Sequence, residues 1–316
     1  MKSVLSAPHF HDEAAAYKFL EARVWPTGIV CPHCGGADRI SKMQGKSTRI
    51  GVYKCYQCRM QFSVKVGTVF EASHVKLHIW LQAVALLSSS KKGISSNQLS
   101  RTLGVTLKTA WFMSHRIREA MRDGKLALMG GVGSIVEMDE TYHGPVAVPR
   151  DVTTSGRPYT KSGKTGPSNK RAIISLVERG GNVRSFHVES ADKSTVTKIV
   201  NENLGQETRV HTDESRIYLH LKELVSEHQS INHHRGEYVR GDVHTNNVES
   251  YFSVFKRGMR GTYQHCKEKH LHRYLAEFDF RHNNRVALGV NDTARSDRIL
   301  TGIVGKRLTY ETTHKG

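Results

Sequence analysis

The sequence predicts an α/β domain that follows two small N-terminal modules, a β ribbon and a helix-turn-helix. Three observations support this fold class. Two C-x-x-C pairs lie early in the chain, a short helix pattern is followed by a glycine and a longer helix pattern, and the remaining half mixes strand and helix patterns. We expect the ribbon in residues 1–70, the helix-turn-helix in 71–130, the α/β domain in 131–290 and a tail in 291–316.

Charge is distributed unevenly along the 316 residues. Lys and Arg number 47 against 29 Asp and Glu, which gives a formal net charge of +18. Residues 1–130 alone hold 19 basic and 7 acidic side chains, so we expect a nucleic-acid-binding region there, with general solubility or ribosome binding as the alternatives. No stretch approaches the ~20 apolar residues of a membrane span, and the N-terminus lacks an apolar signal region. We expect a soluble, cytoplasmic protein with no membrane partner.

Four of the five cysteines form the two pairs Cys31-x-x-Cys34 and Cys55-x-x-Cys58, separated by 20 residues. Thiolates at this spacing converge on one tetrahedral ion, and the glycine after Cys34 permits the tight turn that points backbone amides at sulfur. The spacing predicts structural zinc, and two disulfides are the alternative that a cytosolic location disfavours. Alternating side chains predict short strands at 39–42, 53–55 and 61–66.

Residues 76–88 are apolar nearly all round and predict a buried helix. Residues 95–103 then predict a short helix, Gly104 a turn, and Thr106 the cap of a longer helix that reaches Met121. This order is typical of a helix-turn-helix, although a three-helix linker bundle has the same pattern. If the long helix enters the major groove, the side chains that face DNA are Thr106, Lys108, Thr109, His115 and Arg116.

The second half of the chain predicts three strands, a helix, a strand and further helices. The strands cover 134–142, 171–177, 183–188 and 209–213, and the helix covers 192–204. Glycines at 180 and 181 predict a hairpin between the second and third strands. Two strands end in acidic residues, Asp139 on the first and Asp213 on the fourth. Each acid by itself is more often a solvated or capping carboxylate.

The stretch from His244 to Gly261 predicts the most informative helix. Its apolar residues recur at i, i+3, i+4 and i+7, the stripe of a helix that packs on a core. Glu249 and Lys256, seven residues apart, project from one side beside that stripe, and Asn246 is expected to cap the N-terminus. An ordinary amphipathic surface helix with a charged face is the alternative.

The order of these elements and acids resembles the ribonuclease H-like fold of transposases and integrases. Three motifs make the resemblance specific: Met138-Asp-Glu-Thr-Tyr, His211-Thr-Asp-Glu, and His244-Thr-Asn-Asn-Val-Glu with its Phe-Lys-Arg-Gly continuation. They look like the catalytic motifs of DDE transposases of bacterial insertion sequences, in the branch with an N-terminal zinc ribbon. The segment 269–285 is similar to the C-terminal helix of that branch. The chain departs from the pattern at Pro145, where a second glycine is expected.

The resemblance implies a catalytic triad of Asp139, Asp213 and Glu249 that binds two Mg²⁺ or Mn²⁺ ions, with Asn246 and Lys256 as accessory residues. Two divalent ions stabilise the attacking and leaving oxygens of phosphoryl transfer, and carboxylates are the ligands that such hard cations prefer. Glu140 and Glu214 are adjacent to triad acids and are expected to face away. Further expected DNA contacts are Lys164, Lys170, Arg171, Arg257 and Arg260.

The segment 148–171 is basic, rich in Gly, Ser and Thr, and without periodicity. We interpret it as an arm that becomes ordered on DNA. The 19 histidines include the pair His233 and His234. Their scatter favours phosphate contacts or ordinary surface positions over a second metal site.

The resemblance therefore predicts a transposase that binds the terminal inverted repeats of its element, cleaves at the ends and joins the 3′-hydroxyls to target DNA. Its partners would be double-stranded DNA at the element ends and the target, and a second copy of the chain in a homodimer or larger assembly on the nucleoid. Two alternatives stay open. One is a non-catalytic DNA-binding regulator descended from a transposase, and the other is a structure-selective nuclease of the same fold.

Overall fold

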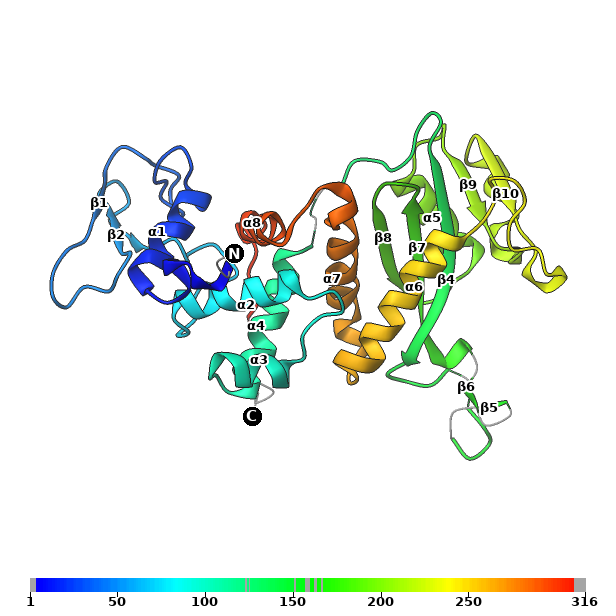
Figure 1. Ribbon diagram of the computed structural model, residues 1–316, viewed down its shortest axis with the longest axis horizontal. Coiled ribbons are helices and arrows are strands. Elements are labelled where there is room, and N and C mark those ends of the chain that lie inside the picture. The colour runs from blue at the N-terminus through cyan, green and yellow to red at the C-terminus, as the bar shows by residue number, and fades with distance from the viewer. Residues whose placement is uncertain are drawn as a thin grey trace. The chain divides into compact units, whose positions relative to one another are not determined.

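The computed structural model describes residues 4–122, 124, 126–150, 152–156, 160–161, 164–165 and 167–309. The chain forms two compact units (Figure 1). Unit 1 contains residues 1–123 together with 284–316, and unit 2 contains residues 124–283. Within the described ranges, no helix has the length and apolar character required to cross a membrane.

The N-terminal part of unit 1 is a small ribbon with a helix before it. Strands β1 (Ile40–Lys42), β2 (Tyr53–Cys55) and β3 (Gln61–Phe62) form an antiparallel sheet in that order. Its small core contains Tyr53 and Phe62 with two of the paired cysteines. Helix α1 (Glu13–Val24) was not expected from the sequence, because only Ala16 and Leu20 of its side chains are fully buried. The three predicted strands are present, and the third is shorter than expected.

The helix-turn-helix follows the predicted boundaries closely. It comprises α2 (Leu77–Ser89), α3 (Ser96–Leu103) and α4 (Leu107–Ala120). The hydroxyl of Thr106 caps α4 by accepting from the amide of Thr109 at 3.2 Å. Gly104 ends α3 in the left-handed region, at a φ of 64°, where a side chain would be strained.

The C-terminal segment is a structural part of unit 1 and not the tail that we expected. Residues Asp292–Thr301 form helix α8, whose Ile299 and Leu300 are buried. Helix α8 packs on α2, where the hydroxyls of Ser88 and Ser296 lie 2.6 Å apart and Arg295 donates to the carbonyl of Ser88. The boundary after residue 290 is also corrected, because the chain returns to unit 1 at residue 284.

Unit 2 is built on a five-stranded mixed sheet. Its strands are β4 (Ile135–Pro145), β7 (Lys170–Glu178), β8 (Val183–Val188), β9 (Arg209–Thr212) and β10 (Glu227–Ser230). They lie in the order β10-β9-β4-β7-β8, in which β4, β7 and β8 are antiparallel neighbours and β9 is parallel to both β4 and β10. This topology defines the ribonuclease H-like fold that the sequence predicted. Strand β10 was missed, because its residues are polar and only partly buried.

Helices cover both faces of this sheet (Figure 1). Helix α5 (Lys193–Asn203) packs through Val196, Ile199 and Val200 on the face that carries Val136 and Met138 of β4. Helices α6 (Asn246–Gly258) and α7 (Leu271–Asn283) pack together on the opposite face. Side chains alternate along a strand, so Glu137 and Asp139 of β4 point to the α6 face.

Shorter elements complete the described chain. A two-stranded hairpin, β5 (Thr160–Lys161) and β6 (Lys164–Thr165), lies within the basic segment 148–171. A π-helix, Met259–Tyr263, continues α6. Single 3-10 turns occur at Val4–Ser6, Pro8–Phe10, Pro167–Asn169, Arg216–Tyr218, Leu221–Glu223, His233–Arg235, Glu268–His270 and Val286–Leu288.

Candidate active site and metal centre

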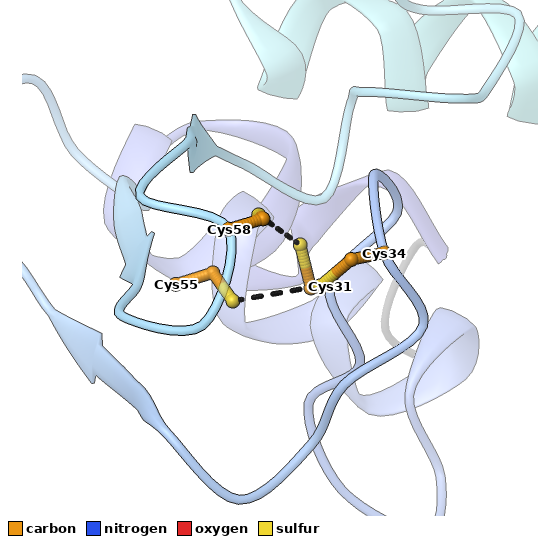
Figure 2. A group of neighbouring side chains, drawn as sticks. All are labelled: Cys31, Cys34, Cys55 and Cys58. Atoms are coloured by element: carbon orange, nitrogen blue, oxygen red, sulfur yellow. Dashed lines mark hydrogen bonds between the residues drawn. The ribbon is translucent and has the colours of Figure 1, made fainter.

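The four predicted zinc ligands converge from two turns of the ribbon (Figure 2). Sγ of Cys31 lies 3.7 Å from Sγ of Cys58, and Sγ of Cys34 lies 3.7 Å from Sγ of Cys55. Tetrahedral zinc with Zn–S bonds of about 2.3 Å separates its sulfurs by about 3.8 Å. The thiols therefore have the spacing that a four-thiolate zinc site requires.

Backbone amides favour the thiolate form at this centre. Hydrogen bonds from the amides of Cys58 and Gln57 to the sulfur of Cys55 lower the pKa of that thiol to about 7. This is the arrangement that the C-x-x-C turn is expected to produce. The donor set and its surroundings fit a structural zinc ion.

Two of the three predicted catalytic acids meet at one end of the central strands of unit 2. In the parallel pairing of β4 with β9, Glu137 is opposite His211. Asp139 and Asp213 each lie two residues further along, so the register brings them level. Carboxylate oxygens of Asp139, Glu140 and Asp213 lie within 4.8 Å of one another.

These acids repel one another in a partly dehydrated site. Burial, followed by the negative charges of Glu140 and Asp213, raises the pKa of Asp139 well above its usual value, although the amide of Glu140 donates to Asp139 at 2.8 Å. Burial also raises the pKa of Asp213, against a hydrogen bond from the amide of Ser215 at 3.0 Å. Hard oxygen ligands with excess negative charge fit a divalent cation.

The third predicted acid, Glu249, lies in the first turn of α6. Its side chain is 46% exposed, accepts from the hydroxyl of Thr245 at 2.7 Å and lies 3.4 Å from Nε2 of His233. Its oxygens are not part of the 4.8 Å cluster of described acids. Its charge is nevertheless near enough to add slightly to the burial that raises the pKa of both Asp139 and Asp213.

The expectation that Glu140 faces away from the site was wrong, because its carboxylate is part of the acidic cluster. Its carboxylate accepts from the hydroxyl of Tyr218 at 2.5 Å. Tyr218 is fully buried and follows Asp213 by five residues. Burial raises the pKa of Glu140, the Tyr218 hydroxyl opposes this shift, and the charge of Asp213 adds to it. The hydroxyl holds the carboxylate toward Asp213, an arrangement that depends on the fold and has no signal in the local sequence.

Lys256 belongs to the same site. Burial lowers the pKa of Lys256, the negative charge of Asp139 opposes this shift, and the positive charges of Arg260 and Lys170 add to it. The side chains of Lys170, Lys256 and Arg260 thus form a basic cluster beside Asp139. Such a cluster is suited to a phosphate backbone.

Asn246 does not cap α6 as we expected. The helix begins at Asn246, and Thr245 is the N-cap residue. Asn246 is exposed three residues before Glu249. Its role beside the triad stays a prediction.

The predicted DNA-contacting residues of α4 divide into two groups. Thr106 and Lys108 are exposed and Thr109 is partly exposed at the start of the helix. His115 and Arg116, in contrast, are 1% and 6% exposed. The assignment of these two residues to DNA contact was wrong.

Arg116 is buried because its guanidinium satisfies three carbonyl groups inside unit 1. It donates to the carbonyls of Val69 at 3.0 Å, Glu71 at 2.8 Å and Leu308 at 3.1 Å. His115 lies against Trp111 in the same helix, with ring centroids 4.2 Å apart. Both side chains support the fold of unit 1.

The prediction that Arg171 contacts DNA is corrected as well, because this side chain is also buried and bound to carbonyl groups. It is 7% exposed and donates to the carbonyls of Pro145 at 2.7 Å and Cys266 at 2.6 Å. Arg257 and Arg260 are exposed at the end of α6 and in the π-helix after it. The side chain of Lys164 lies outside the described residues.

Two residues that sequence reasoning did not assign to the site lie near its acids in space or in sequence. His233, which we expected to contact phosphate or solvent, lies beside Glu249 and lowers the pKa of Asp213 through its charge. Glu137, two residues before Asp139, is fully buried. A glutamate in the middle of the apolar run 135–138 was the available signal for this second residue.

A ribonuclease H-like sheet with one acid on its first strand and one directly after its fourth, preceded by a zinc ribbon and a helix-turn-helix, defines a DDE-type transposase. Two family models agree. Residues 129–283 match the ISXO2-like transposase domain, and residues 11–61 match the transposase zinc-ribbon domain. Both models describe transposases of the same insertion-sequence group and together they match about two thirds of the chain. The chain is therefore a DDE-type insertion-sequence transposase, and both of its matched domains are similar to those of the IS1595 group.

A curated relative is the "Uncharacterized protein in transposable element ISH50" of Halobacterium salinarum. It is 29% identical over 277 residues, which cover 86% of this chain and 91% of the relative. The Mos1 strand transfer complex is similar over 70% of this chain and 73% of that chain, at 11% identity and a TM-score of 0.26. The Mos1 transposase paired-end complex with the left transposon end is similar over 65% of this chain and 76% of that chain, at 12% identity and a TM-score of 0.19. These TM-scores are too low to define a common fold, so the fold assignment rests on the strand order.

Proposed function

We propose that this transposase binds the terminal inverted repeats of its insertion sequence, cleaves DNA at the element ends and joins the 3′-hydroxyls to target DNA. The observation that supports this most strongly is the register of β4 and β9. It brings Asp139 level with Asp213, and α6 carries Glu249 and Lys256, whose charges are near enough to interact with that of Asp139. We infer that Glu249 and Lys256 of α6 complete the site that these two aspartates begin, because metal-dependent phosphoryl transfer requires several acids around the reacting phosphate.

The triad of Asp139, Asp213 and Glu249 would hold Mg²⁺ or Mn²⁺, with Glu140 close enough to assist. When bound, such ions activate the attacking oxygen and neutralise charge on the leaving oxygen. The raised pKa values of Asp139 and Asp213 support this proposal, because burial and neighbouring negative charge both disfavour their ionised forms, and a divalent cation would compensate that cost. The side chains bind and separate the ions, and Lys256 orients the scissile phosphate.

DNA recognition is assigned to unit 1. The exposed start of α4, with Thr106 and Lys108, is suited to the major groove. The ribbon adds basic side chains, and the whole region 1–130 holds 19 basic and 7 acidic residues. We propose double-stranded DNA at the element ends as the ligand of this unit, in a cytoplasmic protein associated with the nucleoid.

Catalysis also needs target DNA and contacts that hold the strand at the acids. Lys170 and Arg260 flank Lys256, so this basic cluster would contact the backbone of the scissile strand. Two ends must be processed together for an element to move. We therefore propose that a homodimer or larger assembly forms on DNA.

The test is to incubate the purified full-length protein with duplexes that carry candidate element ends, a target plasmid and Mg²⁺, and to map the products at nucleotide resolution. The proposal expects nicks at the element boundary and joined products. Binding without nicking would identify a DNA-binding regulator, and nicking without joining would identify a nuclease. Either result would contradict the proposed strand transfer.

A further inference from the structure

A buried glutamate connects the elements that carry the catalytic acids. Glu137 is fully buried as the third residue of β4. Its Oε2 accepts from the amides of Asn247 at 2.8 Å and Val248 at 3.2 Å. Its Oε1 accepts from Nδ2 of Asn247 at 2.7 Å and from Nε of Arg179 at 2.9 Å, and Nδ1 of His244 lies 3.1 Å away.

Glu137 does for α6 what an N-cap side chain ordinarily does. The first amides of a helix lack partners within the helix, and the positive end of its dipole favours a carboxylate. The hydroxyl of the N-cap residue Thr245 donates to Glu249 instead of accepting from a first-turn amide. The carboxylate that satisfies this turn comes from the neighbouring strand, so it fixes the position of α6 against β4.

Arg179 extends the connection to a third element. It follows the last residue of β7, and its side chain is 20% exposed. Besides Glu137, its Nη2 donates to Nδ1 of His211 and to the carbonyl of His244, each at 3.2 Å. One guanidinium therefore joins β4, β9 and the loop before α6, and its planar fork suits contacts in several directions.

The contact points have a constant offset from the predicted acids. Glu137 lies two residues before Asp139 on the same face of β4, and His211 lies two residues before Asp213 on β9. Asn247 lies two residues before Glu249 on α6. The Glu137–Arg179 pair thus lies one step below the two aspartates on the strands, and it holds the first turn of α6, the turn that also contains Glu249.

We propose that Glu137 and Arg179 are positioning residues that set the separation of Asp139, Asp213 and Glu249. The inference rests on the proposed function of these acids. Glu249 needs such a support, because it is half-exposed at the start of a helix while the two aspartates are held by the register of the sheet. A small rotation of α6 would move the Glu249 carboxylate away from Asp139 without unfolding unit 2.

Glu137→Gln is the informative substitution, since it keeps the size of the side chain. The NH₂ group of the glutamine cannot accept a hydrogen bond. It must face either the helix amides or the Arg179 and Asn247 donors, so the hydrogen bonds on that side are lost. Substitutions in groups that hold a metal ligand in place typically lower activity or metal affinity about 10- to 100-fold. We expect the full-length variant to nick element ends 10- to 100-fold more slowly, with its dissociation constant for those ends within twofold of the wild type.

Two measurements separate positioning from general stability. Amide hydrogen exchange of the segment that contains Asn247 and Val248 should become faster in Glu137→Gln, while exchange in β7 and α5 stays at the wild-type rate. Mn²⁺ binding, measured by electron paramagnetic resonance, should weaken about tenfold. Glu178→Gln, at the partly exposed end of β7 next to Arg179, is the matched control and should change none of these values.

Arg179→Lys provides a second variant if Glu137→Gln fails to fold. A lysine keeps the positive charge beside Glu137 but cannot contact His211 and the His244 carbonyl at the same time. We again expect slower nicking and weaker Mn²⁺ binding. Wild-type nicking, Mn²⁺ affinity and exchange rates in a folded variant would overturn the proposal, as would a uniform rise of exchange throughout unit 2.

The failure of the proposed function would be recognisable separately. If the wild-type protein binds Mn²⁺ but neither nicks nor joins DNA, the transposition proposal fails. In that case the exchange and Mn²⁺ measurements still decide whether the Glu137–Arg179 pair positions α6 and its acid.

Discussion

At the scale of single residues, the shape-conserving replacement of each triad acid is the most direct test of catalysis. Asp139→Asn, Asp213→Asn and Glu249→Gln each remove a charge from the proposed metal site and should lower nicking and joining by about 10³-fold or more. Binding to element ends should persist, since fewer negative charges face the phosphates. Glu140→Gln should slow the reaction less, and Glu178→Gln should not slow it. Normal strand transfer by Glu249→Gln would show that α6 does not supply the third acid.

The raised pKa of Asp139 predicts a pH-dependent stability in magnesium-free buffer. Because the pKa of Asp139 is higher in the folded than in the unfolded protein, the free energy of unfolding falls as pH rises through the interval between the two values. Asp139→Asn removes this penalty. At pH 7 the variant should melt above the wild type, by about 2–4 °C for each kcal/mol recovered.

Calorimetry across pH provides the check. The difference between Asp139→Asn and the wild type should disappear below about pH 4, where the carboxyl is protonated in both states. Added Mg²⁺ should stabilise the wild type and leave the variant nearly unchanged. A variant that melts below the wild type at every pH would contradict the destabilising role of this charge.

At the scale of elements, helix α4 has an exposed N-terminal end and a buried body. Arg116→Ala should destabilise unit 1 by about 2–4 kcal/mol, because one buried and two partly buried carbonyls lose their donor. Lys108→Ala, at the exposed start of the helix, should leave melting unchanged and lower DNA affinity. Thermal unfolding paired with fluorescence-anisotropy titrations distinguishes the two effects. The assignment fails if Arg116→Ala keeps full stability and loses only DNA binding.

The ribbon is expected to depend on its metal ion for folding. Its core contains few apolar side chains besides the cysteines themselves, so the free energy of zinc binding is expected to supply much of its folding free energy. Cys55→Ser should therefore release zinc and unfold the ribbon while unit 2 stays folded. Zinc content by mass spectrometry and proteolysis of the ribbon measure this. Retention of one zinc ion per chain in the variant would contradict the four-cysteine site.

At the scale of the whole molecule, unit 1 is closed by a helix from the far end of the chain. Ile299 of α8 is fully buried, so Ile299→Ala should destabilise unit 1 by about 2–5 kcal/mol. Thr293→Ala, on the exposed side of α8, should change stability by less than about 0.5 kcal/mol. Denaturant unfolding of the full chain measures both. Equal stability of the two variants would contradict the structural role of α8 in unit 1.

The sequence by itself determined the parts of this protein that depend on local spacing. The C-x-x-C pairs predicted the zinc ribbon, Gly104 and Thr106 marked the turn and cap of the helix-turn-helix, and strand order with Asp139 and Asp213 predicted the catalytic fold. These signals are short in range, because metal knuckles, caps and strand alternation each involve neighbouring residues. The resemblance of the three acidic motifs supplied the triad that we propose.

Only the tertiary structure decided where the long polar side chains point. Arg116 and Arg171 turn inward because distant carbonyls need donors, and Glu140 turns toward Asp213 because the buried hydroxyl of Tyr218 holds it there. Glu137 contacts a helix turn 110 residues away. A buried polar group takes the partners that the fold brings to it, and those partners are distant in the sequence. Local patterns therefore identified the acids, whereas the contacts that hold them in place required the folded chain.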